Sequence, residues 1–255
     1  NGPQMMMDFR AQAERFETDI RTGYVTKVDF SGPVHKVWVD EKEELQAHSI
    51  IISTGATAKW LGLESELRIR DLGGGVSACA VCDGFFYRGQ DVAIVGAGDT
   101  AAEEALYLSK VCKSVKMIVR RDEMRASKIM QQRVFDAGNI EVLWNTETLE
   151  VLGDQVVEGV KVVNNQTNEE TVLDVTGFFV AIGHKPNTDI FKGWLDMDDT
   201  GYLKHRPDSS HSNIEGVFIS GDAGDKVYRQ AVTAAGTGCM AALDAERFLG
   251  EKGLH

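Results

Sequence analysis

Apolar residues recur at helical spacing near the start of the chain and at strand spacing after it. Met6, Phe9, Ala13 and Phe16 fall near one face of a helix, so the pattern predicts a helix over residues 3–17. β-branched and aromatic residues then predict three strands, YVTKVDF (24–30), HKVWVD (35–40) and SIIIST (49–54). The third is a short apolar run that ends at a turn, which is typical of a buried strand.

The middle of the chain repeats an order of strand, helix, strand and helix. The stretch 91–111 begins with an apolar strand, passes through glycines and continues as a helix with Ala101, Ala105 and Leu108 on one side. Residues 114–121 predict a second strand, and residues 127–138 predict a helix. This order is typical of the parallel sheet of an α/β nucleotide-binding domain.

The last third of the chain returns to shorter strands and closes with one long helix. Four shorter strands cover EVLWN (141–145), TLEVLGD (148–154), VEGVKVVNN (157–165) and TVLDVTGFFVAIG (171–183), and we expect a β-meander inserted among them. GVFISGDAGD (216–225) is another strand that ends in a turn, and residues 229–250 predict an alanine-rich helix. The strands that end at a glycine, such as those at 91–98 and 216–221, are similar to one another, which indicates two related nucleotide-binding folds.

Composition and charge remove several classes of partner. The chain has 255 residues, 43% of them hydrophobic, and a formal net charge of −12. Nucleic acids and anionic membranes need a basic face, so neither is an expected partner. No apolar run reaches the ~18 residues of a membrane span, and no charged-then-apolar leader opens the chain. We therefore expect a cytoplasmic protein without a membrane segment.

Two of the four cysteines stand at redox spacing in SACAVCDGFF (77–86). Cys79 and Cys82 could form a structural disulfide, half of a zinc site, or a dithiol that opens and closes. Neither Cys112 nor Cys239 has a cysteine partner two residues away, and the six histidines show no HxxxH spacing, so we predict no metal site. We interpret Cys112 and Cys239 as small buried apolar residues. The redox interpretation of the pair is favoured.

A glycine-rich turn follows the apolar strand at 91–95. The sequence GAGDTA fits G-x-G-x-x-A, with Gly96, Gly98, Asp99, Thr100 and Ala101 as candidate nucleotide-binding residues. The first glycine permits the tight turn, the second lets a pyrophosphate approach the backbone, and the alanine lets helix and strand pack closely. The motif is weak alone, but a strand before it and a helix after it support nucleotide binding.

Arginines stand where an NAD-binding protein usually has an acidic residue. The next strand ends in VRRDEMRA, which places Arg120, Arg121 and Arg125 near the ribose of a bound nucleotide. Guanidinium groups suit a 2′-phosphate through charge-assisted, often bidentate hydrogen bonds. The alternative is a solvated helix start. We interpret the cluster as an NADPH site, because a basic cluster in an acidic chain is unlikely to arise by chance.

Taken together, six motifs resemble the low-molecular-weight thioredoxin reductases, a class of pyridine nucleotide-disulfide oxidoreductases. They are CAVCDG, GAGDTAAEEALYL, RRDEMRASK, AIGHKPNT, GVFISGDAGD and YRQAVTAAGTGCMAALDAERFL, and they cover nearly the whole chain. The resemblance implies two Rossmann-like α/β domains, an FAD domain at 1–73 and 201–255 and an NADPH domain with the CxxC at 74–200. The second is inserted in the first. It also implies a homodimer, with hinges at DLGGG (71–75) and near 201–207.

The resemblance also assigns roles to individual residues. Further cofactor-binding residues are Thr54, Gly55, Ala56, Ile182, Gly183, Gly221, Asp222, Arg229, Gln230 and Ala231. The family transfers electrons from NADPH through FAD to a disulfide and on to thioredoxin. By this likeness Cys82 lies against the flavin, Cys79 attacks the substrate, and Asp83 supplies a proton. From the residues alone, Asp83 is equally well a turn residue before Gly84.

One part of the family pattern is missing from this sequence. The first G-x-G-x-x-G, within a βαβ unit of ~30 residues, normally opens the chain and binds the FAD pyrophosphate. We expect that residues precede Asn1 and that residues 1–255 alone hold FAD weakly. Two alternatives stay open: a related flavin disulfide reductase that serves a peroxidase or another dithiol carrier, and a non-catalytic NADP-binding sensor.

Overall fold

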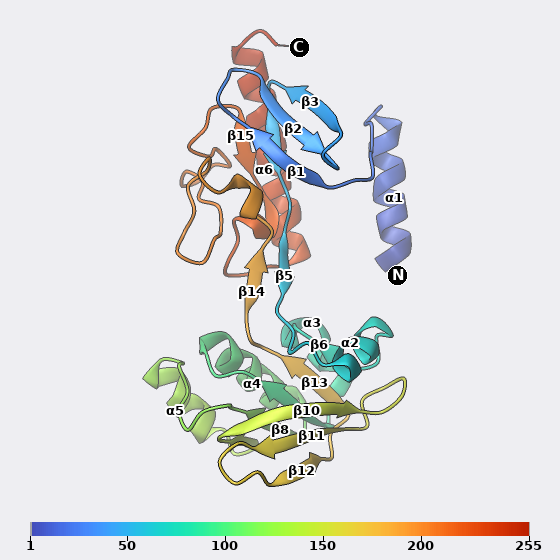
Figure 1. The fold of residues 1–255 in the computed structure, drawn as a ribbon, viewed down its shortest axis with the longest axis vertical. Helices are drawn as coiled ribbons and strands as arrows, with labels where there is room; N and C mark the ends of the chain where they lie inside the picture. Colours follow the sequence, from blue (N-terminus) through green and yellow to red (C-terminus); the bar gives the residue numbers. More distant parts are fainter. Residues whose placement is uncertain (1, 255) are drawn as a thin grey trace. The chain divides into compact units, whose positions relative to one another are not determined.

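The computed structural model describes residues 2–254 and divides the chain into two compact units. Unit 1 runs from the N-terminus to Gly55 and from Pro186 to the C-terminus, and unit 2 comprises Ala56–Lys185. Both units contain parallel strands together with helices (Figure 1). The predicted α/β architecture, with one domain inserted in the other, is therefore confirmed.

The chain crosses between the units through two short paired strands. β5 (Ala56–Ala58) pairs with β14 (His184–Pro186), and the Lys59 amide donates to the Gly183 carbonyl at 2.9 Å. The boundaries expected from sequence, 73/74 and 200/201, lie further along the chain and inside the two units.

The glycine run at 71–75 is packed rather than free. The Val157 amide donates to the Gly74 carbonyl at 2.8 Å, and a Cβ atom on Gly74 would overlap the Gln155 carbonyl oxygen. The segment 201–207 is also tied down, since the Leu203 amide donates to the Ala223 carbonyl at 2.9 Å. At 71–75 the glycines allow two backbone segments to approach closely. The chain passes between the two units at β5 and β14 instead.

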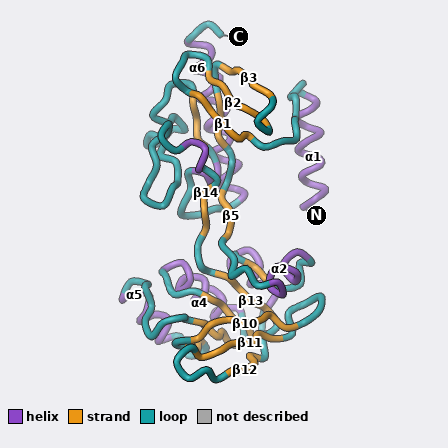
Figure 2. Tube along the Cα trace, viewed as in Figure 1, coloured by secondary structure: helices purple, strands orange, loops and turns teal. Residues whose placement is uncertain are grey.

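Unit 2 is built on a five-stranded parallel sheet of order β6-β13-β7-β8-β9. Its strands are β6 (Val76–Ser77), β7 (Asp91–Val95), β8 (Ser114–Ile118), β9 (Ile140–Leu143) and β13 (Gly177–Val180). Figure 2 labels β13 of this sheet among the strands, which are drawn in orange. Side chains alternate between the two faces of the sheet. Val92 and Ile94 join the core under the helices, whereas Ala93 faces the second core.

Helices and an antiparallel meander supply the other layers of unit 2. α4 (Asp99–Val111) packs on β7 and β8 and contacts α5 (Lys128–Asp136). Ala101, Ala105 and Leu108 are fully buried, which confirms the predicted helix face. The meander is β10 (Thr146–Leu152), β11 (Gly159–Asn164) and β12 (Glu170–Leu173), as expected. The short helices α2 (Glu64–Asp71) and α3 (Ala80–Asp83) complete the unit.

Unit 1 combines a parallel strand pair, a meander and two longer helices. β4 (Ile50–Ile52) pairs in parallel with β15 (Val217–Ile219), and α6 (Ala231–Glu251) contacts both. The meander is β1 (Val25–Asp29), β2 (His35–Val39) and β3 (Glu43–Ala47), and α1 spans Gly2–Arg15.

The prediction of a buried strand at 49–54 is wrong in part. Ile52 is buried, whereas Ile51 is exposed, because successive side chains point to opposite faces and one face is open. No helix within residues 2–254 is both long and apolar enough to cross a bilayer.

Candidate active site

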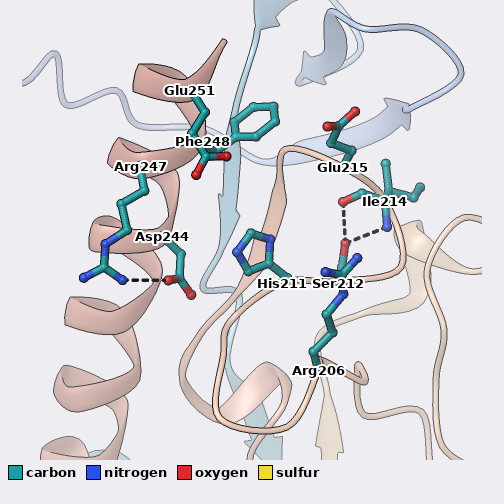
Figure 3. Close-up of a pocket in the computed structure, with 9 residues that line it drawn as sticks. All are labelled: Arg206, His211, Ser212, Ile214, Glu215, Asp244, Arg247, Phe248 and Glu251. Carbon is teal, nitrogen blue, oxygen red and sulfur yellow. Dashed lines mark hydrogen bonds and ion pairs between the residues drawn. The ribbon is translucent and has the colours of Figure 1, made fainter.

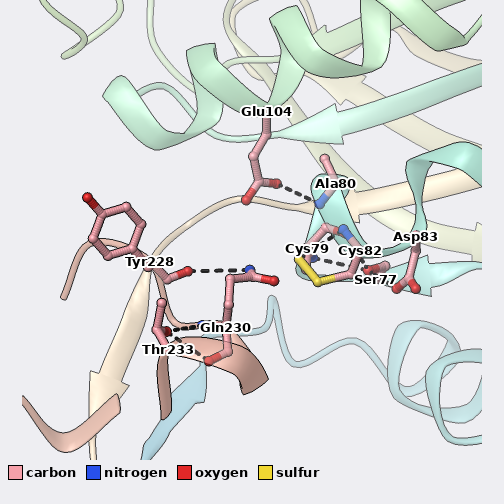
Figure 4. The surroundings of a disulfide bond; sticks show 9 residues. All are labelled: Ser77, Cys79, Ala80, Cys82, Asp83, Glu104, Tyr228, Gln230 and Thr233. Atoms are coloured by element: carbon pink, nitrogen blue, oxygen red, sulfur yellow. Dashed lines mark hydrogen bonds between the residues drawn. A yellow bond between two sulfur atoms is a disulfide. The ribbon is translucent and has the colours of Figure 1, made fainter. Parts of the chain in front are cut away.

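A disulfide joins Cys79 and Cys82 at the start of α3, directly after β6 (Figure 4). Cys79 has an extended backbone and caps α3, and its Sγ accepts a hydrogen bond from the Cys82 amide at 3.2 Å. The two Cα atoms lie 5.3 Å apart. An amide that donates to a sulfur also stabilises that sulfur as a thiolate, so the geometry suits a pair that opens on reduction.

The two sulfur-bearing residues differ in exposure. Cys82 is exposed, whereas Cys79 is half-buried. This is the reverse of the order expected if Cys79 is the outer thiol. The amide hydrogen bond to Cys79 favours Cys79 as the thiolate, so accessibility and thiolate stabilisation point to different cysteines.

Asp83 is held by a serine that the sequence reasoning missed. The Ser77 hydroxyl donates to Asp83 Oδ2 at 2.6 Å, and the Cys79 amide donates to Ser77 Oγ at 3.1 Å. The Asp83 amide in turn donates to the Cys79 carbonyl at 3.1 Å. These bonds fold the CxxCD loop onto the end of β6. The available sequence signal was a polar residue directly before the cysteine motif.

The disulfide loop is also attached to the nucleotide-binding helix. Glu104 of α4 accepts a hydrogen bond from the Ala80 amide at 3.4 Å. Gly84 is buried, and a Cβ atom there would lie 2.9 Å from Leu108 Cδ2. The cysteine motif and the G-x-G-x-x-A helix are therefore parts of one packed assembly within unit 2.

The glycine-rich turn between β7 and α4 adopts the geometry that its sequence indicates. Gly96 has a positive φ of 150°, and a Cβ atom there would overlap the Ala181 carbonyl and crowd the Ala101 methyl. Space around Gly98 is open to a ligand. Asp99 accepts the Ser127 amide at 2.9 Å, which lowers the pKa of its carboxyl, and Thr100 is exposed at the helix start.

Two of the three candidate arginines share a hollow. Arg120 and Arg121 line a depression of about 410 Å³ together with Asn145 and Asn165. Asp122 and Glu147 line the same hollow, but within residues 2–254 neither guanidinium forms an ion pair with a carboxylate, so both can still turn to an anion. Arg125 is exposed but does not line this hollow, and its amide donates to the Ala97 carbonyl at 2.7 Å.

Two asparagines that sequence reasoning missed hold the backbone of the arginine pair. The Asn145 amide donates to the Arg121 carbonyl at 3.0 Å, and the Asn165 side chain donates to the Arg120 carbonyl at 2.9 Å. Both asparagines lie next to or in the meander strands. No residue pattern along the chain connects them with positions 120 and 121, so only the fold reveals the contact.

The candidate flavin residues of unit 1 gather where β15 meets α6. Gly221 and Asp222 lie in a short 3-10 turn, η3 (Gly221–Ala223), and the Gly221 amide donates to Thr237 Oγ1 at 2.9 Å. Asp222 Oδ1 is buried without a hydrogen-bond partner among the described residues. Burial, and after it the negative charge of Asp225, raises the pKa of Asp222. A buried acceptor without a donor fits a ligand that carries hydroxyl groups.

The remaining candidates lie at the start of α6 and around the crossing strands. Gln230 caps α6, Ala231 begins it, and the Arg229 amide donates to Asp225 Oδ2 at 3.0 Å. Around the crossing, the Asn187 side chain and amide donate to the carbonyls of Thr54 and Gly55, Ala56 begins β5, and Ile182 and Gly183 precede β14.

The two remaining cysteines differ from each other. Cys112 is buried, as predicted, and burial followed by the charge of Asp91 raises its pKa to about 11. The prediction that Cys239 is buried is wrong, because it lies on an exposed face of α6. In an alanine-rich helix both faces carry small apolar residues, so the sequence does not show whether a cysteine faces the core or the solvent.

A separate hollow of about 480 Å³ lies beside the C-terminal half of α6 (Figure 3). Its lining mixes Arg206 and Arg247 with acidic side chains, and Asp244 is already bonded to the hydroxyl and amide of Ser210. None of the predicted site residues lines it, and its two arginines stand beside three acids, Glu215, Asp244 and Glu251.

Comparison with known families agrees with this arrangement. The pyridine nucleotide-disulphide oxidoreductase family matches residues 4–238, and the chain belongs to that family. Thioredoxin reductase from Rickettsia conorii is 49% identical over 251 residues, which are 97% of this chain and 80% of the relative. Thioredoxin reductase from Streptomyces coelicolor is 49% identical over 248 residues, 97% of this chain and 76% of the relative.

Solved structures show the same similarity. Thioredoxin reductase from Giardia duodenalis aligns with a TM-score of 0.90 and 39% identity over 98% of this chain and 82% of that chain. Thioredoxin reductase from Streptococcus pyogenes MGAS5005 aligns with a TM-score of 0.92 and 34% identity over 98% of this chain and 81% of that chain. The resemblance drawn from the sequence motifs is confirmed.

Proposed function

We propose that the protein is an NADPH-dependent, FAD-containing thioredoxin reductase. The observation that carries the proposal is the Cys79–Cys82 disulfide, with Asp83 beside it, fixed to the helix of a nucleotide-binding turn. A non-catalytic NADP-binding sensor would have no use for a disulfide in this position. The expected homodimer remains a prediction of the resemblance, and the cytoplasmic location remains a prediction from the sequence.

The residues of unit 2 fit NADPH. The turn at Gly96 and Gly98 leaves backbone amides and the N-terminus of α4 open to a pyrophosphate. Arg120 and Arg121 carry unpaired charges in one hollow, which suits a 2′-phosphate. The asparagine hydrogen bonds to their carbonyls fix the backbone from which both side chains extend.

The residues of unit 1 fit FAD. The unpartnered Asp222 oxygen would accept a hydroxyl of the ribityl chain, and Gly221, Arg229, Gln230 and Ala231 would lie along the cofactor. When bound, FAD accepts a hydride from NADPH and passes two electrons to the disulfide. The boundaries of the FAD and NADPH domains follow the two compact units in this proposal.

The surface beside the disulfide suits a protein substrate. Val81, Phe85 and Phe86 are 57%, 61% and 73% exposed on α3 and on the 3-10 turn that follows it. Contiguous exposed aromatic side chains beside a reactive group are typical of a docking surface. A small-molecule disulfide would need no such surface, so oxidised thioredoxin or a similar protein is the proposed substrate.

The residues of the chain then act in a balanced exchange. In the reduced enzyme one thiolate attacks the substrate disulfide, forms a mixed disulfide and releases a substrate thiolate. The second thiolate attacks the mixed disulfide, restores Cys79–Cys82 and releases the second substrate thiol. Two electrons and two protons pass to the substrate, and in this proposal Asp83 transfers a proton between an enzyme thiol and a departing thiolate.

The test is NADPH oxidation by the FAD-containing enzyme with a dithiol reporter, in the presence and absence of thioredoxin. We expect turnover that depends on thioredoxin and is lost in Cys79→Ser and Cys82→Ser. Equal turnover without thioredoxin, or a strict need for a peroxidase-linked carrier, would contradict the proposed substrate.

The same single mutants assign the roles of the two thiols. Each is mixed with thioredoxin that lacks its resolving cysteine and carries its remaining cysteine as a mixed disulfide with thionitrobenzoate. The enzyme thiolate attacks that disulfide, thionitrobenzoate leaves, and the adduct is read on a non-reducing gel. A stronger adduct with Cys82→Ser supports Cys79 as the attacking thiol, as the family resemblance implies. A stronger adduct with Cys79→Ser supports Cys82, the more exposed of the two, as the attacking thiol.

A further inference from the structure

We propose that Ser77 is a positioning residue that holds Asp83 in place through both of its protonation states. The inference rests on the proposed function, because it deepens the role of the carboxylate beside the disulfide. It concerns the transfer of protons during thiol–disulfide exchange, and it requires no contact outside unit 2.

The hydroxyl of Ser77 is surrounded by three partners. It donates to Asp83 Oδ2 at 2.6 Å, with the Cys79 carbonyl as a second acceptor at 3.4 Å, and it accepts from the Cys79 amide at 3.1 Å. Ser77 is 9% exposed, so water has little access to these bonds. Figure 4 shows the Ser77 side chain directed toward the Asp83 carboxylate.

A serine hydroxyl has one hydrogen to donate and two lone pairs that accept. With Asp83 ionised, the hydroxyl hydrogen is directed to the carboxylate. When Asp83 carries a proton, its O–H can donate to Ser77 Oγ, and the serine hydrogen then turns to the Cys79 carbonyl. A small rotation about one bond therefore satisfies both states, so Asp83 can take and return a proton without leaving a half-buried polar group unpaired.

This arrangement also connects the acid to the residue whose sulfur reacts. Cys79 contributes both its amide and its carbonyl to the Ser77 hydroxyl, and its carbonyl also accepts the Asp83 amide. During exchange Asp83 receives the proton of an enzyme thiol, which thereby becomes the attacking thiolate, and then gives that proton to the departing substrate thiolate. Ser77 keeps the carboxyl group oriented while the proton is held.

The test compares Ser77→Ala with a serine in a matching contact elsewhere in unit 2. Ser114 donates to Asp91 Oδ1 at the same distance, 2.6 Å, at the opposite ends of β7 and β8 from the glycine-rich turn. The FAD-containing enzyme is reduced with a phosphine, freed of reductant and mixed with oxidised thioredoxin in a single turnover. This half-reaction needs neither NADPH nor hydride transfer.

We expect Ser77→Ala to slow the single turnover about tenfold, Asp83→Asn to slow it about a hundredfold or more, and the double mutant to be no slower than Asp83→Asn. NADPH should reduce the flavin of every variant at the wild-type rate. Ser114→Ala should match the wild type, and Ser77→Thr, which keeps the hydroxyl, should recover most of the rate and report on the site if Ser77→Ala fails to fold.

Two results would overturn the inference while leaving the proposed function intact. One is an unchanged single turnover in Ser77→Ala. The other is a double mutant about tenfold slower than Asp83→Asn, since Ser77 would then act independently of the carboxylate. If the reduced wild-type enzyme fails to reduce thioredoxin at all, the proposed function itself is wrong.

Discussion

Glu66 is a fully buried carboxylate whose removal should destabilise unit 2 severely. Its oxygens accept the amides of Leu61, Gly62 and Leu63 at 3.0, 2.8 and 3.2 Å, and the residue has no exposed surface. The Glu66 carboxylate thus fixes the conformation of the loop that joins β5 to the start of α2.

The magnitude follows from the three bonds lost in Glu66→Ala. A hydrogen bond to a charged group contributes about 1.5–3 kcal/mol, and an amide left unsatisfied in the interior costs a similar amount. Gly62 is exposed, so its amide can return to water, and the low end of the range applies. The expected loss is about 3–5 kcal/mol, or about 10–20 °C in the melting temperature of a domain of this size.

The assay is thermal unfolding of the variant beside Glu64→Ala, with hydrogen exchange at residues 61–63. Glu64 is an exposed acid in the first turn of the same helix, so its removal should cost less than about 1 kcal/mol. Amide exchange at 61–63 should speed up only in Glu66→Ala. If the two variants melt together, or exchange stays slow in both, the anchoring role of Glu66 is refuted.

Three further predictions rest on single groups. Arg120→Ala with Arg121→Ala should weaken NADPH binding by one to two decades per lost charged bond and spare NADH, and an unchanged NADPH/NADH ratio contradicts the 2′-phosphate assignment. At pH 8 a thiol reagent should modify Cys239 rapidly and Cys112 only after unfolding, because burial raises the Cys112 pKa to about 11. Asp222→Asn should stabilise the flavin-free protein at pH 7, because a raised pKa means that ionising Asp222 costs folding free energy. The gain in melting temperature should shrink as the pH falls and vanish below the ordinary aspartate pKa of about 4.

The features that sequence predicted well are those whose physical cause is local. The 3.6-residue spacing of Ala101, Ala105 and Leu108 reflects burial of one helix face, and the structure buries all three. The cysteine pair is equally local, because two intervening residues allow the sulfurs to meet without any help from the rest of the fold.

The features that sequence missed depend on partners distant along the chain or on atypical burial. α2 escaped prediction because its few buried residues include a carboxylate, Glu66, which no apolar pattern can show. Asn165 reaches Arg120 across 45 residues of chain through the meander. The stretch 71–75 is predicted as a hinge from its composition, which cannot distinguish a flexible glycine from one packed against another backbone, as Gly74 and Gly75 are.

The pairing of β5 with β14 has a consequence for modularity. Because the two segments are hydrogen-bonded neighbours, the first and last residues of unit 2 lie side by side. Another protein chain can therefore gain or lose the whole of unit 2 at a single point of its surface. An excised 56–185 segment would keep its own sheet, both of its cores and the disulfide. The Cys79–Cys82 disulfide and the glycine-rich turn therefore belong to one segment that could be moved between proteins as a unit.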